Sequence, residues 1–155
     1  RYSSKYYMQL VFTGWWGTGA IKHCIKRAIK PYRCFTSRWN TCKSSEKGKI
    51  GVEREAITEY KVLKQSRVED DHLHKFAYLE VYPKTGRTHQ IRVHLKSIGR
   101  PVVCDFLYAP KKPKALGFER LALHAFSIKF KNLAGDTVVA EASLPQDFLK
   151  AEASL

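Results

Sequence analysis

The sequence lacks several features that would identify whole classes of protein. It contains no uninterrupted apolar run of roughly 18 residues, so it predicts no membrane-spanning helix. None of its four cysteines lies in a Cys-x-x-Cys pair, the close spacing that is usual among zinc ligands. No secretory signal pattern and no GxGxxG loop followed by a helix is present. We therefore expect no metal site and an intracellular protein with reduced thiols, and the sequence does not distinguish cytoplasm, mitochondrion and plastid.

Acidic residues are also scarce. The chain has 14 Asp and Glu against 28 Lys and Arg, which gives a net charge of +14 with neutral histidines. Such an excess favours a polyanionic partner, because each phosphate that a protein cation neutralises releases condensed counterions. On charge alone, a basic protein without a nucleic-acid role stays open as the alternative.

The cations are densest in residues 22–49, where Glu46 is the only acid. Three aromatic residues, Tyr32, Phe35 and Trp39, are interleaved with them. Cations with aromatics suit phosphate contacts combined with base stacking. An insertion that is merely solvated, with its aromatics pinning it to the core, explains the pattern equally well.

The rest of the chain alternates strand and helix patterns without a regular βαβ rhythm. Between residues 121 and 130 the alternation changes phase near Ala125, which indicates a β-bulge. The fold class that follows is α+β, with a mixed, largely antiparallel sheet and flanking helices. The predicted strands cover residues 6–12, 56–63, 76–82, 121–130 and 138–144, of which the second and third form an antiparallel pair.

One helix is predicted, over residues 88–98. Ile91, Leu95 and Ile98 recur at helical spacing and should face the core. Thr88 is the expected N-cap, and Gly99 is the expected end of the helix.

The segment that holds this helix carries the most specific pattern in the chain. Residues 83–95 read P-K-T-G-R-T-H-Q-I-R-V-H-L, which resembles the TGRTHQIRxH signature of RluA-type RNA pseudouridine synthases. Segments before and after it resemble the same family in the same order: Lys5-Tyr6-Tyr7, residues 55–60, residues 99–102, Asp105 with Tyr108, and residues 120–125. The family usually has glycine where this chain has Cys104.

The resemblance covers nearly the whole chain and is weakest over residues 13–50. It implies that residues 1–155 form the C-terminal portion of a single pseudouridine synthase catalytic domain, with a basic insertion at about 22–49. It also implies isomerisation of uridine to pseudouridine in ribosomal or transfer RNA, a reaction that needs no cofactor.

The resemblance suggests roles for individual residues. By position in the motifs, Arg92 resembles the cation that keeps the family's catalytic aspartate ionised, since an opposite charge lowers a carboxyl pKa. Tyr7 resembles the active-site tyrosine, and Leu123 resembles the apolar wall of the uracil pocket. The predicted RNA-binding residues comprise three in the signature, which also hold the loop, and seven cations in two basic loops: Arg87, His89, Gln90, Lys26, Arg27, Lys30, Arg33, Arg38, Lys111 and Lys112.

One part of the family pattern is missing from these residues. The family's catalytic aspartate lies in an H-R-L-D motif upstream of the Lys-x-Tyr strand, and none of the five aspartates here follows an Arg-Leu pair. We therefore expect the chain alone to be inactive, and the sheet to show an unpaired edge where an upstream half would pack. We also expect Arg92 to bind a carboxylate from outside the chain or to face solvent, and an Arg92 buried against Asp105 would contradict this. The alternative is a catalytically inactive RNA-binding or ribonucleoprotein assembly protein derived from the family.

Overall fold

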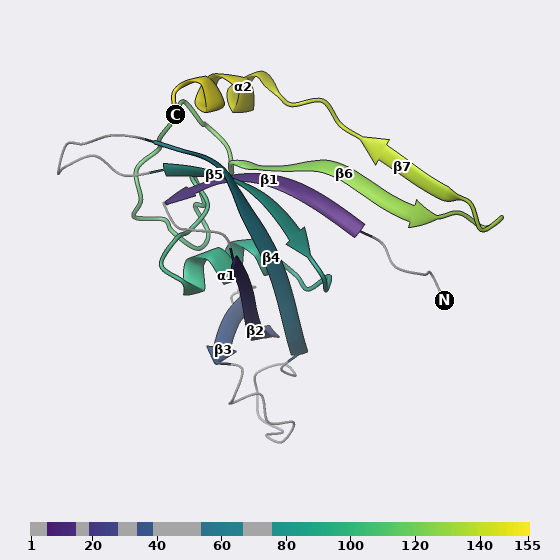
Figure 1. Cartoon of the computed structure of the whole chain (residues 1–155). Helices are drawn as coiled ribbons and strands as arrows, with labels where there is room; N and C mark the ends of the chain where they lie inside the picture. Colours follow the sequence, from purple (N-terminus) through teal and green to yellow (C-terminus); the bar gives the residue numbers. More distant parts are fainter. Residues whose placement is uncertain (1–5, 15–18, 28–33, 39–53, 67–75) are drawn as a thin grey trace.

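The computed structural model describes residues 6–14, 19–27, 34–38, 54–66 and 76–155, with side-chain surroundings from residue 54 onward. Its strands form one twisted sheet in the order β3-β2-β4-β5-β1-β6-β7, and every neighbouring pair is antiparallel (Figure 1). The predicted α+β class and the antiparallel β4–β5 pair are therefore confirmed. The described elements are β1 Tyr6–Gly14, β2 Gly19–Arg27, β3 Cys34–Arg38, β4 Arg54–Gln65, β5 Phe76–Pro83, α1 Gln90–Ser97, β6 Leu123–Lys131, β7 Thr137–Glu141 and α2 Gln146–Ala153.

The strands follow the alternation that the sequence predicts. In β4, Ala56 and Thr58 are fully buried while Glu55 and Glu59 on the other face are exposed, because successive side chains of a strand point to opposite faces of the sheet. The predicted bulge in β6 is confirmed. Gln9 lies opposite Ala125 but Met8 lies opposite Ser127, so one extra residue is accommodated in β6.

Helix α1 is shorter at its start than predicted, and Thr88 is not its N-cap. The helix begins at Gln90, and the residue before it, His89, adopts a left-handed backbone conformation with φ 54°. The preceding turn is closed by the Gln90 N–H, which donates to the Arg87 carbonyl at 3.1 Å. At the other end Gly99 has φ 75°, and the Gly99 and Arg100 N–H groups bond back to Lys96 and Leu95. This is the Schellman arrangement, so the predicted stop is confirmed.

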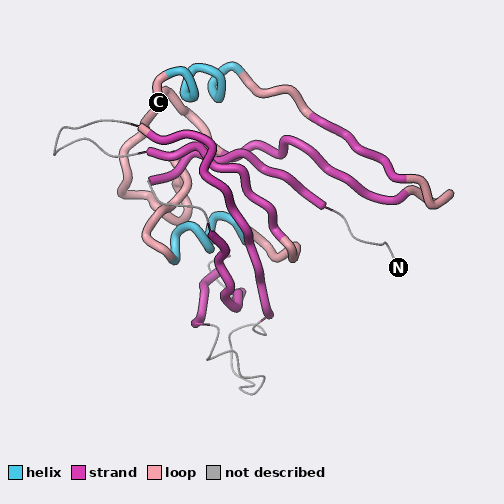
Figure 2. The backbone as a smooth tube through the Cα atoms, viewed as in Figure 1, coloured by secondary structure: helices cyan, strands magenta, loops and turns pink. Residues whose placement is uncertain are grey.

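Three elements were not predicted: β2 and β3, which lie within the expected turn and basic insertion, and helix α2. Figure 2 shows α2 as a short helix that follows an extended link after β7. Its eight residues are too few for a helical repeat to stand out in the sequence. The predicted last strand also ends earlier, at Glu141 instead of residue 144.

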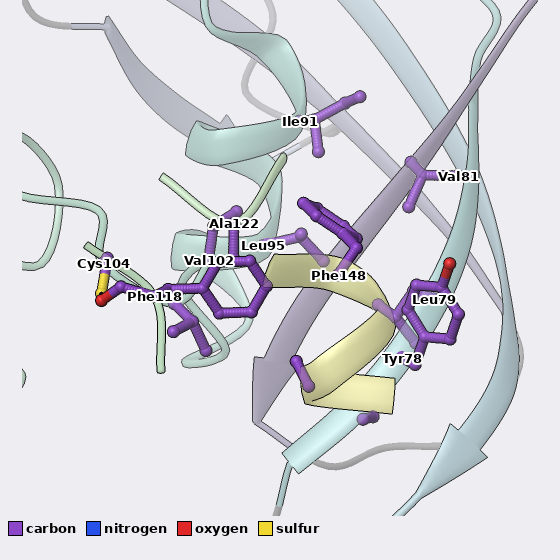
Figure 3. Close-up of a cluster of buried hydrophobic side chains, with 13 residues drawn as sticks. Tyr78, Leu79, Val81, Ile91, Leu95, Val102, Cys104, Phe118, Ala122 and Phe148 are labelled. Carbon is purple, nitrogen blue, oxygen red and sulfur yellow. The ribbon is translucent and has the colours of Figure 1, made fainter. Parts of the chain in front are cut away.

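The core lies where β5, α1 and α2 converge (Figure 3). Phe148 of α2 is fully buried and packs edge-on against Phe118, with ring centroids 5.1 Å apart. Leu79 and Val81 of β5 and Leu95 of α1 complete the same cluster. This packing fixes the beginning of α1, and hence the signature loop, relative to the sheet.

The strands β6 and β7 extend away from this core (Figure 1). In the described sheet β7 has one neighbour, and most of its residues are exposed. This agrees with the predicted unpaired edge, although every open sheet has an edge, so the finding does not by itself indicate a missing segment.

Candidate functional site

A pocket of about 450 Å³ opens where the signature loop meets the start of β6. Its wall includes the cations Arg87 and Arg92 beside the apolar side chains of Leu121 and Leu123. Such a volume, with apolar walls and a few convergent polar groups, is typical of a small-molecule site. Five residues that were predicted from the sequence meet at this pocket: Arg87, His89, Gln90, Arg92 and Leu123.

Gln90 holds the signature loop against β4. Its side chain is buried, and Oε1 accepts hydrogen bonds from the Thr85 hydroxyl at 2.7 Å and the Arg87 N–H at 3.0 Å. Its Nε2 donates to the Ile57 carbonyl and to the Thr58 hydroxyl, each at 2.9 Å. Both amide atoms are thus occupied inside the protein, which supports the predicted role in holding the loop.

Further bonds attach the loop to the same strand. The Ile57 N–H donates to the Thr85 hydroxyl at 3.1 Å, and the Arg87 Nε donates to the Glu55 carbonyl at 3.1 Å. The fully buried His94 of α1 lies 2.8 Å from the Thr58 hydroxyl through Nδ1. The loop geometry is therefore set by a polar network that joins α1 to β4.

Arg92 binds a carboxylate of the chain itself. Its Nε and Nη2 atoms donate to the two oxygens of Asp105 at 2.9 and 2.7 Å. The Asp105 carboxylate is fully buried and also accepts the N–H groups of Leu107 and Tyr108 at 3.2 and 2.9 Å. The prediction that Arg92 would bind an outside carboxylate or face solvent is therefore wrong, because a turn at residues 102–105 brings Asp105 back to the helix.

The charges of this pair are stable at neutral pH. Burial alone would raise the pKa of Asp105, but hydrogen bonds from Arg92 and from the Tyr108 backbone outweigh it and hold that pKa below its usual value. The hydrogen bond to Asp105 raises the pKa of Arg92. Asp105 is thus an ionised but fully engaged acceptor, which serves to orient Arg92.

Tyr108 connects this ion pair to the left-handed residue at the start of α1. Its hydroxyl lies 2.9 Å from Nδ1 of His89, and the two rings meet edge-on. The Arg92 guanidinium lies over the Tyr108 ring, 5.0 Å from its centroid, a distance suited to a cation–π contact. Asp105 and Tyr108 lie in a family-like segment of the sequence but had no predicted role, since only the fold brings them to the helix.

Two predicted site residues remain, Leu123 at the pocket and Tyr7 on β1. Leu123 lies opposite Val11 of β1, whereas Tyr7, four residues before Val11 in the same strand, lies opposite Ile128. That separation is about 13 Å at the usual rise of a strand, and the Tyr7 side chain lies outside the described part of the structure. The role of Tyr7 stays a prediction.

The predicted RNA-binding cations fall into two groups. Lys111 and Lys112 are exposed on the loop that follows Tyr108. Of the others, the structure describes only the backbone of Lys26 and Arg27 in β2 and of Arg38 in β3. Lys30 and Arg33 lie outside the described residues.

Two further observations concern the described residues alone. They contain no group of three or more His, Cys, Asp or Glu side chains that could hold a metal ion. No helix among them has the length and apolar character required to cross a membrane.

Comparisons with known proteins agree with this geometry. The family profile described as RNA pseudouridylate synthase matches residues 1–97. The chain is 42% identical over 78 residues to the dual-specificity RNA pseudouridine synthase RluA of Vibrio cholerae, covering 50% of this chain and 28% of that enzyme. It is 35% identical over 114 residues to ribosomal large subunit pseudouridine synthase D of Xanthomonas campestris, covering 66% and 32% respectively.

The fold is also shared with solved structures. Human RNA pseudouridylate synthase domain containing 4 superimposes with a TM-score of 0.69 at 21% identity, over 97% of this chain and 62% of that one. At this identity the likeness establishes the fold alone. The chain spans about a third or less of the length of the curated relatives it matches. Profile, relatives and the intact signature at the pocket agree that the chain belongs to the RNA pseudouridylate synthase family and is of the RluA type.

Proposed function

We propose that this chain provides the uridine-binding part of an RNA pseudouridine synthase that acts on ribosomal or transfer RNA. The observation that carries the proposal is the pocket, where the signature loop, Arg92 and Leu123 meet. A uracil ring has apolar faces and polar edges. Leu121 and Leu123 suit the faces, and the cations and loop backbone suit the edges and the attached phosphates.

In the proposed reaction, the glycosidic bond from C1′ of ribose is transferred from N1 to C5 of uracil. The bond between N1 of uracil and C1′ of ribose breaks, the ring turns, and a bond forms between C5 and C1′. The C5 proton leaves to solvent and N1 gains a proton, so atoms and electrons balance without a redox partner. We propose that the Tyr7 hydroxyl serves in the late proton transfer, as general acid–base groups do when they lie within hydrogen-bonding reach.

The nucleophilic carboxylate is proposed to come from outside these 155 residues. Among the described aspartates, Asp105 is buried with four hydrogen bonds, Asp136 closes a turn with Asn132, and Asp147 pairs with Arg120. A guanidinium has five N–H donors, and Asp105 occupies two of them. Arg92 therefore retains donors at the wall of the pocket, where they suit a polar edge of the uracil or a phosphate oxygen.

The structural contacts of the described aspartates also favour a second candidate function. A chain without its own nucleophile can still grip folded RNA through the pocket loop and its basic surface, as a catalytically inactive RNA-binding or ribonucleoprotein assembly protein. The presence of an H-R-L-D segment in a longer natural polypeptide would favour the enzyme over this alternative.

The deciding experiment measures tritium released from RNA labelled at C5 of uridine. The 155-residue chain and any longer natural polypeptide that contains it are compared, each with an Arg92→Ala variant as control. Release by the longer polypeptide alone, abolished by Arg92→Ala, would support the enzyme. Salt-sensitive RNA binding by both without release would support the binding protein.

A further inference from the structure

An exposed aromatic residue lies beside the Arg92–Asp105 pair. Phe106 immediately follows the buried Asp105, yet 54% of its surface is accessible to solvent. A phenyl ring in water forgoes most of the stabilisation that its burial would provide. Single exposed apolar residues are common, so exposure alone does not mark Phe106 as functional. The surroundings of the ring are what distinguish it.

The backbone around Phe106 holds the ring outward. Cys104 has a left-handed conformation with φ 56°, which a side-chain-bearing residue rarely adopts. Asp105 turns inward to Arg92, and its Oδ1 accepts the N–H groups of Leu107 and Tyr108 on the far side of Phe106. The exposed ring thus sits on a loop whose neighbouring residues on both sides are fixed.

Two exposed lysines follow on the same loop. The Ala109 N–H donates to the Asp105 carbonyl at 2.8 Å, and the Lys112 N–H donates to the Ala109 carbonyl at 3.0 Å, so residues 105–112 fold into successive turns. Lys111 and Lys112 are exposed, and none of the ion pairs found between described residues involves them. Lys114 differs, since it pairs with Glu119.

This loop is attached to the pocket. Tyr108 touches both His89 and Arg92, which line the pocket. Phe106 is two residues from Tyr108, a chain distance of at most about 7 Å between their Cα atoms. Phe106 therefore lies on the loop whose Tyr108 contacts two residues of the pocket wall.

We propose that Phe106, Lys111 and Lys112 form a docking surface for the RNA that flanks the target uridine. Phe106 stacks on an unpaired neighbouring base, and the two lysines bind the adjoining phosphates. Removing a base from its helical stack is unfavourable, and a protein ring that replaces the lost stacking partner offsets that cost. The inference rests on the proposed function, because it assumes that RNA occupies the pocket.

The test measures the affinity of the full chain for a fluorescently labelled single-stranded oligouridine at several salt concentrations. Phe106→Ala should weaken binding by roughly 5- to 150-fold, the range for loss of one base–aromatic stack. Phe106→Trp should preserve affinity and Phe106→Leu should not, since leucine is apolar but has no ring face. Replacing Lys111 and Lys112 together with alanine should lower the salt slope by about 1.4, or about 0.7 for each phosphate contact.

Matched controls lie on the hairpin formed by β6 and β7. Leu133, 98% exposed, is the control for Phe106, and Lys129 with Lys131 is the control for the lysine pair. Their alanine variants should bind as the unmodified chain does, and circular dichroism checks that every variant folds. Normal binding by Phe106→Ala, or equal binding by the Leu and Trp variants, would overturn the docking surface while leaving the proposed function intact. Failure of the unmodified chain to bind RNA would overturn both.

Discussion

At the scale of single residues, the site depends on side chains that never need to touch a substrate. Gln90 has no unused amide atom, because its four hydrogen bonds all go to the signature loop or to β4. Asp105 accepts four hydrogen bonds and fixes the guanidinium of Arg92. Buried polar groups that are fully satisfied define one geometry, whereas half-satisfied ones are costly.

Asp105 makes the stability of the chain depend on acid pH. Its folded pKa lies below the unfolded value of about 3.9. The stabilisation is therefore present above that value and is lost as pH falls through the lower folded pKa. Asp105→Asn should reduce the free energy of unfolding at neutral pH by about 3 kcal/mol, since it leaves the partly buried Arg92 without its charge partner. It should also remove part of the acid-induced loss.

Urea unfolding between pH 2 and pH 7 measures both effects. Asp136→Asn is the control, because Asp136 is exposed in the turn between β6 and β7. An Asp105→Asn variant with the same neutral stability and the same acid profile as the unmodified chain would show that the ion pair contributes nothing to folding.

At the scale of elements, helix α2 closes the core although it is only eight residues long. Phe148 carries that role, with Arg120 lying 5.5 Å over its ring and pairing with Asp147 at 2.8 Å. Arg120 and its neighbours resemble a family motif, yet in this structure the guanidinium anchors the C-terminal helix. Arg120 thus lies in a family motif and makes contacts that stabilise the fold.

Phe148→Ala should destabilise the chain by about 3–5 kcal/mol, because it opens a cavity among Phe118, Tyr78 and Leu95. Hydrogen exchange of the α2 amides should accelerate to the rate of a frayed terminus, while urea unfolding reports the total loss. Leu149→Ala is the control, since Leu149 lies on the same helix and is 43% exposed. Equal effects from the two variants would mean that α2 is not docked through Phe148.

At the scale of the whole molecule, the core packs against β5 in the middle of the sheet, and the hairpin of β6 and β7 extends away from it (Figure 1). The outer strand β7 presents Val139, 55% exposed, beside a row of backbone groups with a strand on one side only in the described sheet. Such an edge is a template for pairing with another chain.

Val139→Lys should therefore reduce self-association without changing stability, because a charge on an exposed edge blocks pairing of strands. Light scattering during incubation at increasing protein concentration measures the association. Val138→Lys is the contrasting variant, since Val138 is half-buried and a charge there should lower the stability itself. Unchanged association of Val139→Lys would show that β7 is not the contact between chains.

Much of this protein follows from short-range patterns in its sequence. Alternating residues in β4 and β5, the phase change at Ala125 and the glycine after α1 each act over a few residues, so local sterics and burial determine them. The signature of residues 85–94 likewise identifies the family, because a match at all nine of its specified positions is specific without any coordinates.

The tertiary structure alone decided the contacts between distant segments. Asp105 reaches Arg92 and Tyr108 reaches His89 only because a turn with a left-handed Cys104 folds that segment back onto α1. The docking of α2 through Phe148 and the pairing of β2 with β4 are of the same kind. Their free energy comes from burial and hydrogen bonding between residues far apart in the chain, and no local periodicity encodes which partners will meet.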